Sequence, residues 1–216
     1  MSETQDAEAD AEADAGTAAE TASPARPHTG RRRNEAAHRA ILDAALHLLA
    51  ESDGTPVTID AIARTAGVGK QTVYRWWPSK GAVLLDALTD RADQDVHGPD
   101  TGDLGADLRA FITTTFEAAQ HDTTASALRT VAREAARDPH LAELMRGFTA
   151  ARRGALRELL ARGRERGELA EHADLDLIAD QVYGVFWYRF LLGHATLDAD
   201  TAERLASSLT RGNAPG

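Results

Sequence analysis

Cysteine is absent from the sequence, and so are long apolar runs. Without cysteine there is no disulfide framework, no thiolate metal site and no thiol nucleophile. No stretch approaches the ~18 consecutive apolar residues of a membrane-spanning helix, and the N-terminus has no apolar signal-peptide segment. We therefore expect a protein of the cytoplasm that has no contact with membranes.

Motifs of catalysis and cofactor binding are missing as well. The segment Gly67 to Lys70 looks like part of a phosphate-binding loop, but Arg64 stands where that loop needs its first glycine. No two histidines are spaced three or four apart, as a helical metal site requires. His172, Asp174 and Asp176 lie close together, where a polar turn and a helix cap explain them better than a metal site. We predict no enzyme, no cofactor and no metal.

Charge is unevenly distributed along the chain, whose net charge is −10. Residues 1–30 hold seven acids and one arginine, and they repeat Ala, Glu and Asp without an aromatic side chain. Such a stretch cannot bury enough apolar surface to offset its chain entropy, so we predict a disordered acidic tail. Residues 31–91 hold nine bases and seven acids, and residues 92–216 hold fourteen bases and twenty acids. The positive segment is the part suited to meet phosphate.

A helix-turn-helix pattern occupies the stretch from Thr58 to Leu85. Thr58 can cap a first short helix, which ends at Gly67, where a left-handed residue is favoured. A second short helix spans Lys70 to Trp76 and stops before Pro78. Its outer side is polar, which suits base edges and phosphates in a major groove. A solvated helical hairpin that binds no nucleic acid would show the same local pattern.

This stretch closely resembles the DNA-binding domain of TetR-family transcriptional regulators. The resemblance rests on Ala66-Gly67-Val68, on Thr72-x-Tyr74 and on Lys80, and it covers about residues 33–87. Gly69 stands where the family usually has serine, so we expect a weaker cap on the second helix. The pair Trp76-Trp77 replaces the usual phenylalanine, and we expect one of the two indoles in the core and the other near DNA.

The resemblance and the helical spacing together predict an all-α fold with two domains. Residues 31–80 would form a three-helix helix-turn-helix DNA-binding domain, and residues 81–216 a larger helical domain for ligand binding and dimerisation. Apolar residues at helical spacing predict a first helix over Asn34–Glu51 and a linking helix over Gly81–Ala92. The polar stretch Asp93–Gly105 would be a loop, and no strand alternation is present.

The expected DNA contacts form a compact set. By resemblance, Thr72, Tyr74 and Lys80 bind phosphates. Lys70 and Gln71 are best placed for base edges, because lysine can donate to guanine and glutamine can pair with adenine. Arginines just before the first helix would form a basic arm that reaches DNA or simply stays solvated. The predicted DNA-binding residues are Arg33, Thr58, Lys70, Gln71, Thr72, Tyr74, Arg75 and Lys80.

Apolar aromatic side chains in the C-terminal half mark candidate walls of a pocket for a small-molecule effector of unknown identity. Packing in the core is the competing explanation for each, because a buried aromatic residue at helical spacing needs no ligand. The candidates are Phe111, Phe116, Leu128, Met145, Phe148, Tyr183 and Trp187.

The segment from Leu175 to about Gly193 is apolar on more than one side, so its second face needs a partner. By resemblance, helices over about Asp174–His194 and Asp198–Arg211 would form a four-helix bundle in a homodimer. Burial within a single chain is the alternative. The candidate interface residues are Val182, Val185, Phe186, Arg189, Leu205 and Leu209.

These features together predict a DNA-binding transcriptional regulator. The favoured form is a ligand-responsive repressor that binds double-stranded, palindromic operator DNA as a homodimer. The alternative is a helical module that binds small molecules or proteins and does not use its helix-turn-helix on DNA. A small helical enzyme is a third hypothesis, and no constellation of residues supports it.

Overall fold

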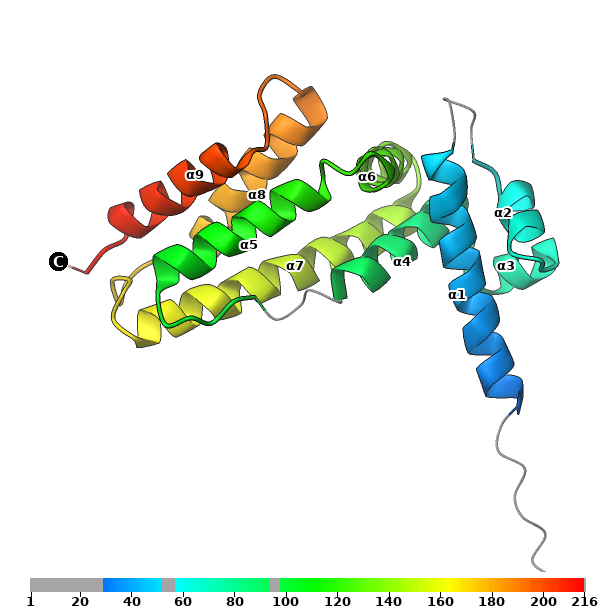
Figure 1. Cartoon of the computed structure of the whole chain (residues 1–216), viewed down its shortest axis with the longest axis horizontal. Helices are drawn as coiled ribbons and strands as arrows, with labels where there is room; N and C mark the ends of the chain where they lie inside the picture. Colours follow the sequence, from blue (N-terminus) through cyan, green and yellow to red (C-terminus); the bar gives the residue numbers. More distant parts are fainter. Residues whose placement is uncertain (1–28, 52–56, 94–97, 216) are drawn as a thin grey trace, which may run out of the picture.

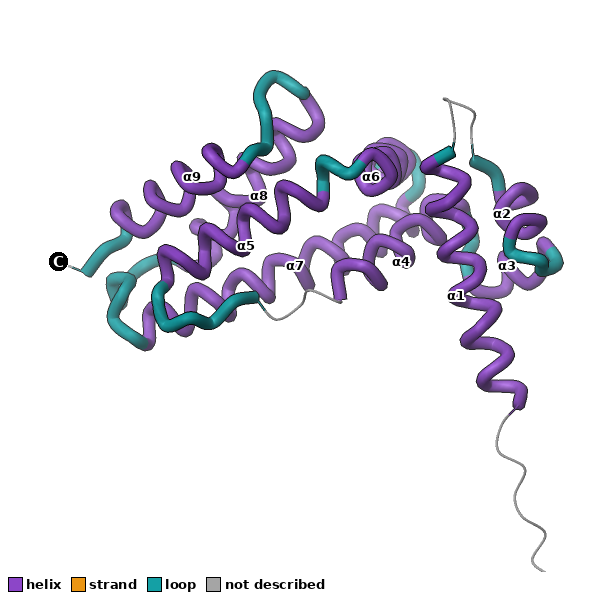
Figure 2. Tube along the Cα trace, in the orientation of Figure 1, coloured by secondary structure: helices purple, strands orange, loops and turns teal. Residues whose placement is uncertain are grey.

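The computed structural model is built of helices joined by short loops (Figure 1). It describes residues 29–51, 57–93 and 98–215. Within these ranges there is no strand, and the predicted all-α fold class is confirmed (Figure 2). No helix in the described part of the chain is long and apolar enough to cross a membrane. The predicted acidic tail lies outside the described residues, apart from its last two positions.

The N-terminal part packs three helices around a small apolar core. These are α1 (Thr29–Ala50), α2 (Ile59–Thr65) and α3 (Lys70–Trp76). Ile41 of α1, Ile62 of α2 and Val73 of α3 are fully buried between them. Helices α2 and α3 lie on the side of α1 that faces away from the C-terminal helices (Figure 1). Helix α3 therefore stands at one extremity of the molecule (Figure 1).

Helix α1 begins five residues earlier than the sequence pattern predicted, at Thr29 in place of Asn34. Residues 31–33 are consequently part of the helix, and the prediction of a basic arm before it is wrong. Helical backbone extends through these arginines because arginine is a good helix former and nothing in the triplet terminates a helix. The side chain of Arg33 lies outside the described residues.

The turn between α2 and α3 follows the predicted chemistry. The Thr58 hydroxyl oxygen accepts a hydrogen bond from the Ala61 backbone N–H at 3.2 Å and so caps α2. Gly67 has a φ of 66°, the left-handed conformation that glycine adopts without a steric cost. Gly69 precedes α3 and offers no side-chain cap. The expectation of a weaker cap at this helix is confirmed.

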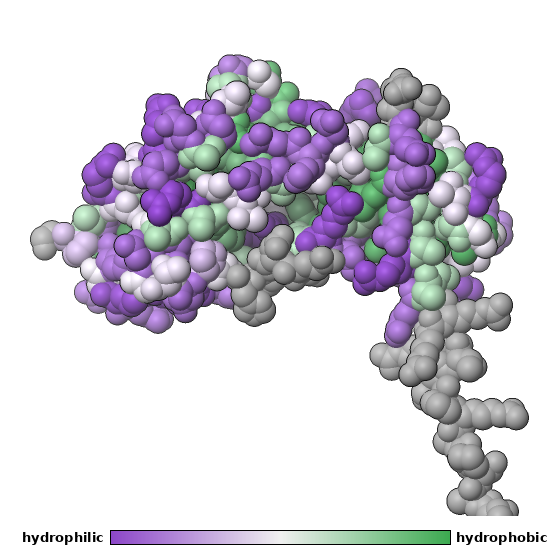
Figure 3. All heavy atoms as spheres, viewed as in Figure 1, coloured by the Kyte–Doolittle hydropathy of each residue, from purple (hydrophilic) through white to green (hydrophobic). Residues whose placement is uncertain are grey.

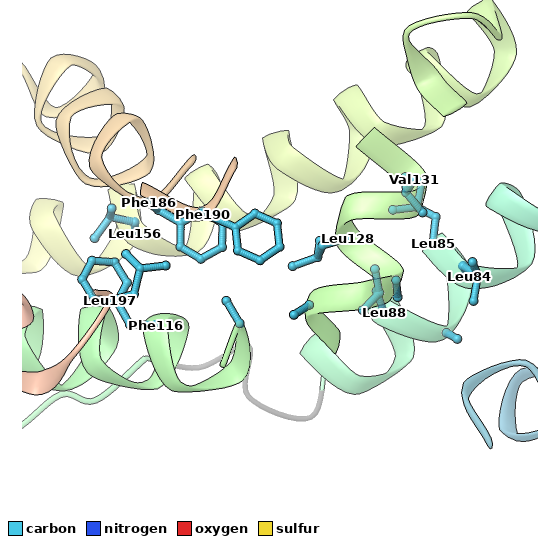
Figure 4. Packing of buried hydrophobic residues seen from close by; sticks show 14 of the residues in the cluster. Leu84, Leu85, Leu88, Phe116, Leu128, Val131, Leu156, Phe186, Phe190 and Leu197 are labelled. Atoms are coloured by element: carbon cyan, nitrogen blue, oxygen red, sulfur yellow. The ribbon is translucent and has the colours of Figure 1, made fainter. Parts of the chain in front are cut away.

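Helix α4 (Lys80–Asp93) joins the two halves of the molecule. The Ser79 hydroxyl oxygen accepts from the Ala82 N–H at 3.2 Å at its start. Its apolar residues are buried on several sides, because it packs against α1, α6 and α7 at once. Figure 4 shows the resulting continuity of the core from Leu84 on α4 through Leu128 on α6 to Phe186 on α8.

The C-terminal part contains five helices. They are α5 (Leu104–Ala118), α6 (Asp122–Ala135), α7 (Pro139–Glu165), α8 (Leu175–Leu192) and α9 (Ala199–Gly212). Helix α5 packs on α7 and α9, and α8 packs on α7. Asp174 caps α8 by accepting from the Asp176 and Leu177 N–H groups at 3.1 and 3.0 Å. This geometry matches the helix cap that the sequence predicted there.

Candidate DNA-binding surface and effector cavity

Helix α3 carries an exposed polar face over a buried anchor. Val73 is fully buried and fixes the helix on the N-terminal core. Lys70, Gln71, Tyr74 and Arg75 are exposed, and the predicted phosphate ligand Thr72 is half-buried. The face is continuous because these residues occupy adjacent positions on two turns of one short helix. Such a face, at the extremity of the molecule, is free to enter a major groove.

Lys70 is held in place by a carboxylate from the preceding helix. Its ammonium lies 2.8 Å from Asp60 Oδ1 and 5.8 Å from the centre of the Tyr74 ring. The hydrogen bond to Asp60 and its charge raise the pKa of Lys70. Both partners are exposed, so this pair contributes little to stability. The base-edge contact of Lys70 stays a prediction.

The tandem tryptophans divide into a core residue and a surface residue. Trp77 is only 5% exposed, and its indole N–H donates to Asp86 Oδ2 at 2.9 Å. His38 Nε2 lies 3.2 Å from the same oxygen. Trp76 is half-buried, and the Arg75 guanidinium lies 5.2 Å from its ring centre. The structure thus decides that Trp77 packs in the core and that Trp76 lies beside the recognition face.

Lys80 forms an ion pair with the C-terminal part of the molecule. Its Nζ lies 2.9 Å from Glu134 Oε1 on α6, and both side chains are about one quarter to one third exposed, at 24% and 31%. The neighbouring Gly81 permits this close packing, because a Cβ there would lie 2.4 Å from Leu141 Cδ2. No sequence pattern predicted Glu134 as a partner, because it is far from Lys80 along the chain. The predicted phosphate ligand is therefore engaged by an acid in this conformation.

A cavity of about 540 Å³ opens between α4, α5, α6, α7 and α8. Four of the seven predicted wall residues line it, and they are Leu128, Phe148, Tyr183 and Trp187. The other three face elsewhere, and their prediction as wall residues is corrected. Phe116 is buried against Phe186, with ring centres 6.2 Å apart, Phe111 lies against Gly98, and Met145 packs at the edge of the core. Helical spacing predicts that these side chains point inward. It does not predict whether they meet the core or the cavity.

Charged and hydroxyl side chains in the cavity wall escaped the sequence reasoning. These residues come from the ends of α4 and α5, from the start of α6 and from α7, and they are Arg91, Thr114, Thr115, Glu117, His121, Thr124, Thr149, Arg152 and Arg153. Tyr183 donates its hydroxyl hydrogen to the backbone oxygen of Arg152 at 3.0 Å. Burial raises the pKa of Tyr183, so this hydroxyl stays neutral. Arg91, Glu117 and His121 remain exposed to solvent at the cavity. Their meeting in one wall depends on the packing of helices that are distant in sequence.

The candidate dimer residues are mostly occupied inside the chain. Val182, Phe186 and Leu209 are buried in the single chain's own core. Arg189 donates to the Thr196 backbone oxygen at 2.7 Å and to Thr201 Oγ1 at 2.8 Å, so it ties the connection between α8 and α9. Val185 and Leu205 are only partly exposed and pack against the same core. The predictions for Val182, Phe186 and Leu209 are therefore corrected to roles in the core, because a buried side chain cannot meet a partner. Val185, Arg189 and Leu205 keep some exposed surface, and their place in an interface stays a prediction.

A different face of α8 remains apolar and exposed. Leu177, Tyr188, Leu191 and Leu192 are 54 to 64% exposed. They follow helical spacing, with the exposed Gly184 between them, so they share one stripe. The outward face of α9 is hydrophilic (Figure 3). Its buried residues pack inward, against α5.

The polar helix α3 is exposed on a three-helix domain, and α4 joins this domain to an all-helical body with a cavity. This arrangement is that of a helix-turn-helix transcriptional regulator. Family models agree with the geometry. Residues 41–87 match the model of bacterial regulatory proteins of the tetR family, and residues 98–209 match the tetracyclin repressor-like C-terminal domain. The chain belongs to the TetR family, and it is a DNA-binding transcriptional regulator.

Individual relatives support the same assignment. The chain is 36% identical over 166 residues to the HTH-type transcriptional regulator YdeS of Bacillus subtilis, covering 76% of this chain and 82% of YdeS. It is 32% identical over 155 residues to the regulator AqdR of Rhodococcus erythropolis, covering 70% and 74%. The crystal structure of the TetR family regulator SCO0332 superposes with a TM-score of 0.72 at 30% identity, covering 83% of this chain and 99% of that one.

Proposed function

We propose that this protein is a ligand-responsive repressor that binds a palindromic operator as a homodimer in the cytoplasm. The observation that carries the proposal is the exposed polar face of α3 at the extremity of the fold. Lys70 and Gln71, at the start of this helix, read base edges. Thr72, Tyr74 and Arg75 bind phosphates on either side and fix the register. The backbone at Thr58 meets phosphate at the start of α2.

Helix α4 supplies the connection between DNA and effector. Its first residue, Lys80, stands beside the helix-turn-helix, and its last turns contribute Leu88, Arg91 and Ala92 to the cavity wall. A ligand that binds better to one position of α4 than to another must shift the equilibrium between the two. The coupling free energy is typically ~1–3 kcal/mol and acts equally in both directions. Effector binding thereby weakens operator binding.

The exposed stripe on α8 is the surface that supports the homodimer. Leu177, Tyr188, Leu191 and Leu192 form an apolar face without cover in the single chain, and contiguous apolar surface of this kind marks an interface. Gly184 within the stripe allows two helices to approach closely. The dimer would place two copies of α3 on one side of a duplex, about 34–36 Å apart or somewhat more.

Freeing Lys80 from its acid should strengthen DNA binding. Glu134→Gln keeps the size of the side chain but removes the charge that holds the Lys80 ammonium at 2.9 Å. We expect tighter binding to all duplexes, with the slope of log K against log salt steeper by about 1, because one more phosphate is neutralised. Lys80→Ala introduced together with Glu134→Gln should abolish this gain. Fluorescence anisotropy with specific and unrelated duplexes at several salt concentrations measures both.

The control for this pair is Glu143→Gln, which removes an exposed acid paired with Arg146 on α7. It should leave affinity and salt slope unchanged. If the slope of log K against log salt is the same for Lys80→Ala, Glu134→Gln and the unmodified protein, then Lys80 does not contact phosphate.

Selection of binding sites from random duplex DNA tests the proposed function directly. The purified protein at near-physiological salt should recover an inverted repeat, and light scattering should give twice the mass of the 23.1 kDa chain. An inverted repeat requires two recognition helices related by a two-fold axis, so it reports specificity and dimerisation together. If no common sequence emerges, either from the full chain or from a variant without residues 1–30, the protein does not read an operator by itself.

A further inference from the structure

Two arginines in the cavity wall have no acidic partner. Arg91 projects from α4, and Arg152 projects from α7. Arg152 Nη1 lies 3.4 Å from the backbone oxygen of Ala92, and its guanidinium lies 6.0 Å from the centre of the Phe111 ring. Among the described residues, no carboxylate lies within ion-pair distance of either side chain. Arg91 is exposed and Arg152 is half-buried. A guanidinium that has no carboxylate partner at a cavity wall is available to bind the anionic group of a ligand.

The adjacent Arg153 shows what a compensated arginine looks like in the same wall. Its Nη2 lies 2.9 Å from Asp180 Oδ1 and 3.6 Å from Asp176 Oδ1. Even so, its Nε is buried and has no hydrogen-bond partner in the described part of the chain. Because Asp176 and Asp180 already compensate this guanidinium and its Nε has no accessible surface, Arg153 is not one of the groups available to a ligand.

One acid opposes these cations. Glu117 of α5 lines the cavity and has no cationic partner among the described side chains. His121 is the remaining titratable group of the wall besides Tyr183. Two unpaired guanidinium groups against one unpaired carboxylate leave the cavity with an excess of positive charge. A cationic ligand is disfavoured, and a single anionic group is favoured.

The rest of the wall is apolar and aromatic. Phe148, Phe186 and Trp187 line it together with Leu88 and Leu128. The Tyr183 hydroxyl hydrogen is already donated to the Arg152 backbone oxygen. This leaves the arginines and the threonine hydroxyls as the donors for a ligand. Such a wall matches a molecule that is hydrophobic over most of its surface and charged at one end.

We infer that this cavity binds an amphipathic monocarboxylate. The carboxylate lies against Arg91 and Arg152, where a planar guanidinium can donate two parallel hydrogen bonds, and the apolar body lies among Phe148, Phe186 and Trp187. The inference rests on the proposed function insofar as the cavity is the effector site. It goes further by naming the ligand's chemical class and the residues that select its charge.

Matched pairs of acids and neutral twins test the inference. Decanoate and decanol share a flexible chain, and 2-naphthoate and 2-naphthamide share a planar body. Titration calorimetry with the full-length protein in the absence of DNA should show binding of at least one acid, about tenfold or more tighter than its neutral twin. Arg152→Gln and Arg91→Gln should each reduce that preference, and the double variant should abolish it.

Two controls separate charge selection from loss of fold. Arg146→Gln on the same helix removes an exposed arginine outside the cavity wall and should preserve the preference. The Arg152→Gln protein should still bind the neutral twin as the unmodified protein does. The inference is overturned if no acid binds, or if each acid and its neutral analogue bind equally. It is also overturned if the preference for the acid survives in the double variant. Because DNA is absent, these outcomes are independent of whether a ligand releases the operator.

Discussion

Loss of sequence preference is the expected result of replacing Lys70 and Gln71 together by alanine. Both side chains are exposed at the start of α3, and each well-oriented contact with a base edge contributes ~1–3 kcal/mol of discrimination. If the two act independently, specific binding falls by about 2–6 kcal/mol relative to non-specific binding. Truncation leaves the fold intact, because Val73 anchors the helix and the Lys70 pair with Asp60 is exposed.

Competition binding with the selected operator and with scrambled duplexes measures this loss. The matched control replaces Arg204 and Ser208 by alanine, two exposed residues on α9 and far from α3 (Figure 1). The control should retain the operator preference. An unchanged preference in the Lys70 and Gln71 double variant would mean that α3 does not read bases through its first turn, and it would favour the module that does not use DNA.

Removal of the Trp77 side chain should produce a large loss of stability. The indole is almost fully buried and donates to Asp86, and its ring lies 4.7 Å from that of His38. Truncation of a buried aromatic residue to alanine typically costs 3–5 kcal/mol, through lost contacts and the remaining cavity, so we expect Trp77→Ala to cost about that much. Urea unfolding followed by far-ultraviolet circular dichroism reports the change in the free energy of unfolding.

The neighbouring indole provides the comparison. Trp76→Ala removes a half-buried ring and should cost clearly less. Trp77→Phe retains aromatic bulk but leaves Asp86 without the indole donor, so its cost should be intermediate. If Trp76→Ala proved the more damaging change, the assignment of Trp77 to the core would be wrong.

Much of the DNA-binding domain could be predicted because its signals are local. The cap at Thr58 and the left-handed turn at Gly67 depend on bonds within a few residues, so residue identity alone decides them. The short helix from Lys70 to Trp76 has the bounds that the sequence predicted. The start of α1 was misplaced because the polar residues before Asn34 continue the helix without an apolar stripe to mark it.

The cavity and the dimer surface could be predicted only in outline. Helical spacing marks Phe116, Val182 and Leu209 as inward-facing, yet a buried residue on one helix can meet the core, a cavity or another chain. The outcome depends on neighbouring helices that lie far away in sequence. Phe186 stacks on Phe116, and α9 packs on α5. These contacts within the chain bury surfaces that the sequence pattern could equally assign to a dimer partner.

The helical fold class, the helix-turn-helix and its polar residues could all be predicted without the structure, because propensity, caps and turn glycines act over short distances. Three features depend on how the helices pack: Trp77 is buried, Lys80 pairs with Glu134, and Arg91 and Arg152 line one cavity with no carboxylate paired to either. Such pairings depend on the angles and positions at which whole helices pack. Those are set by the summed burial of many side chains, and no single stretch of sequence records them.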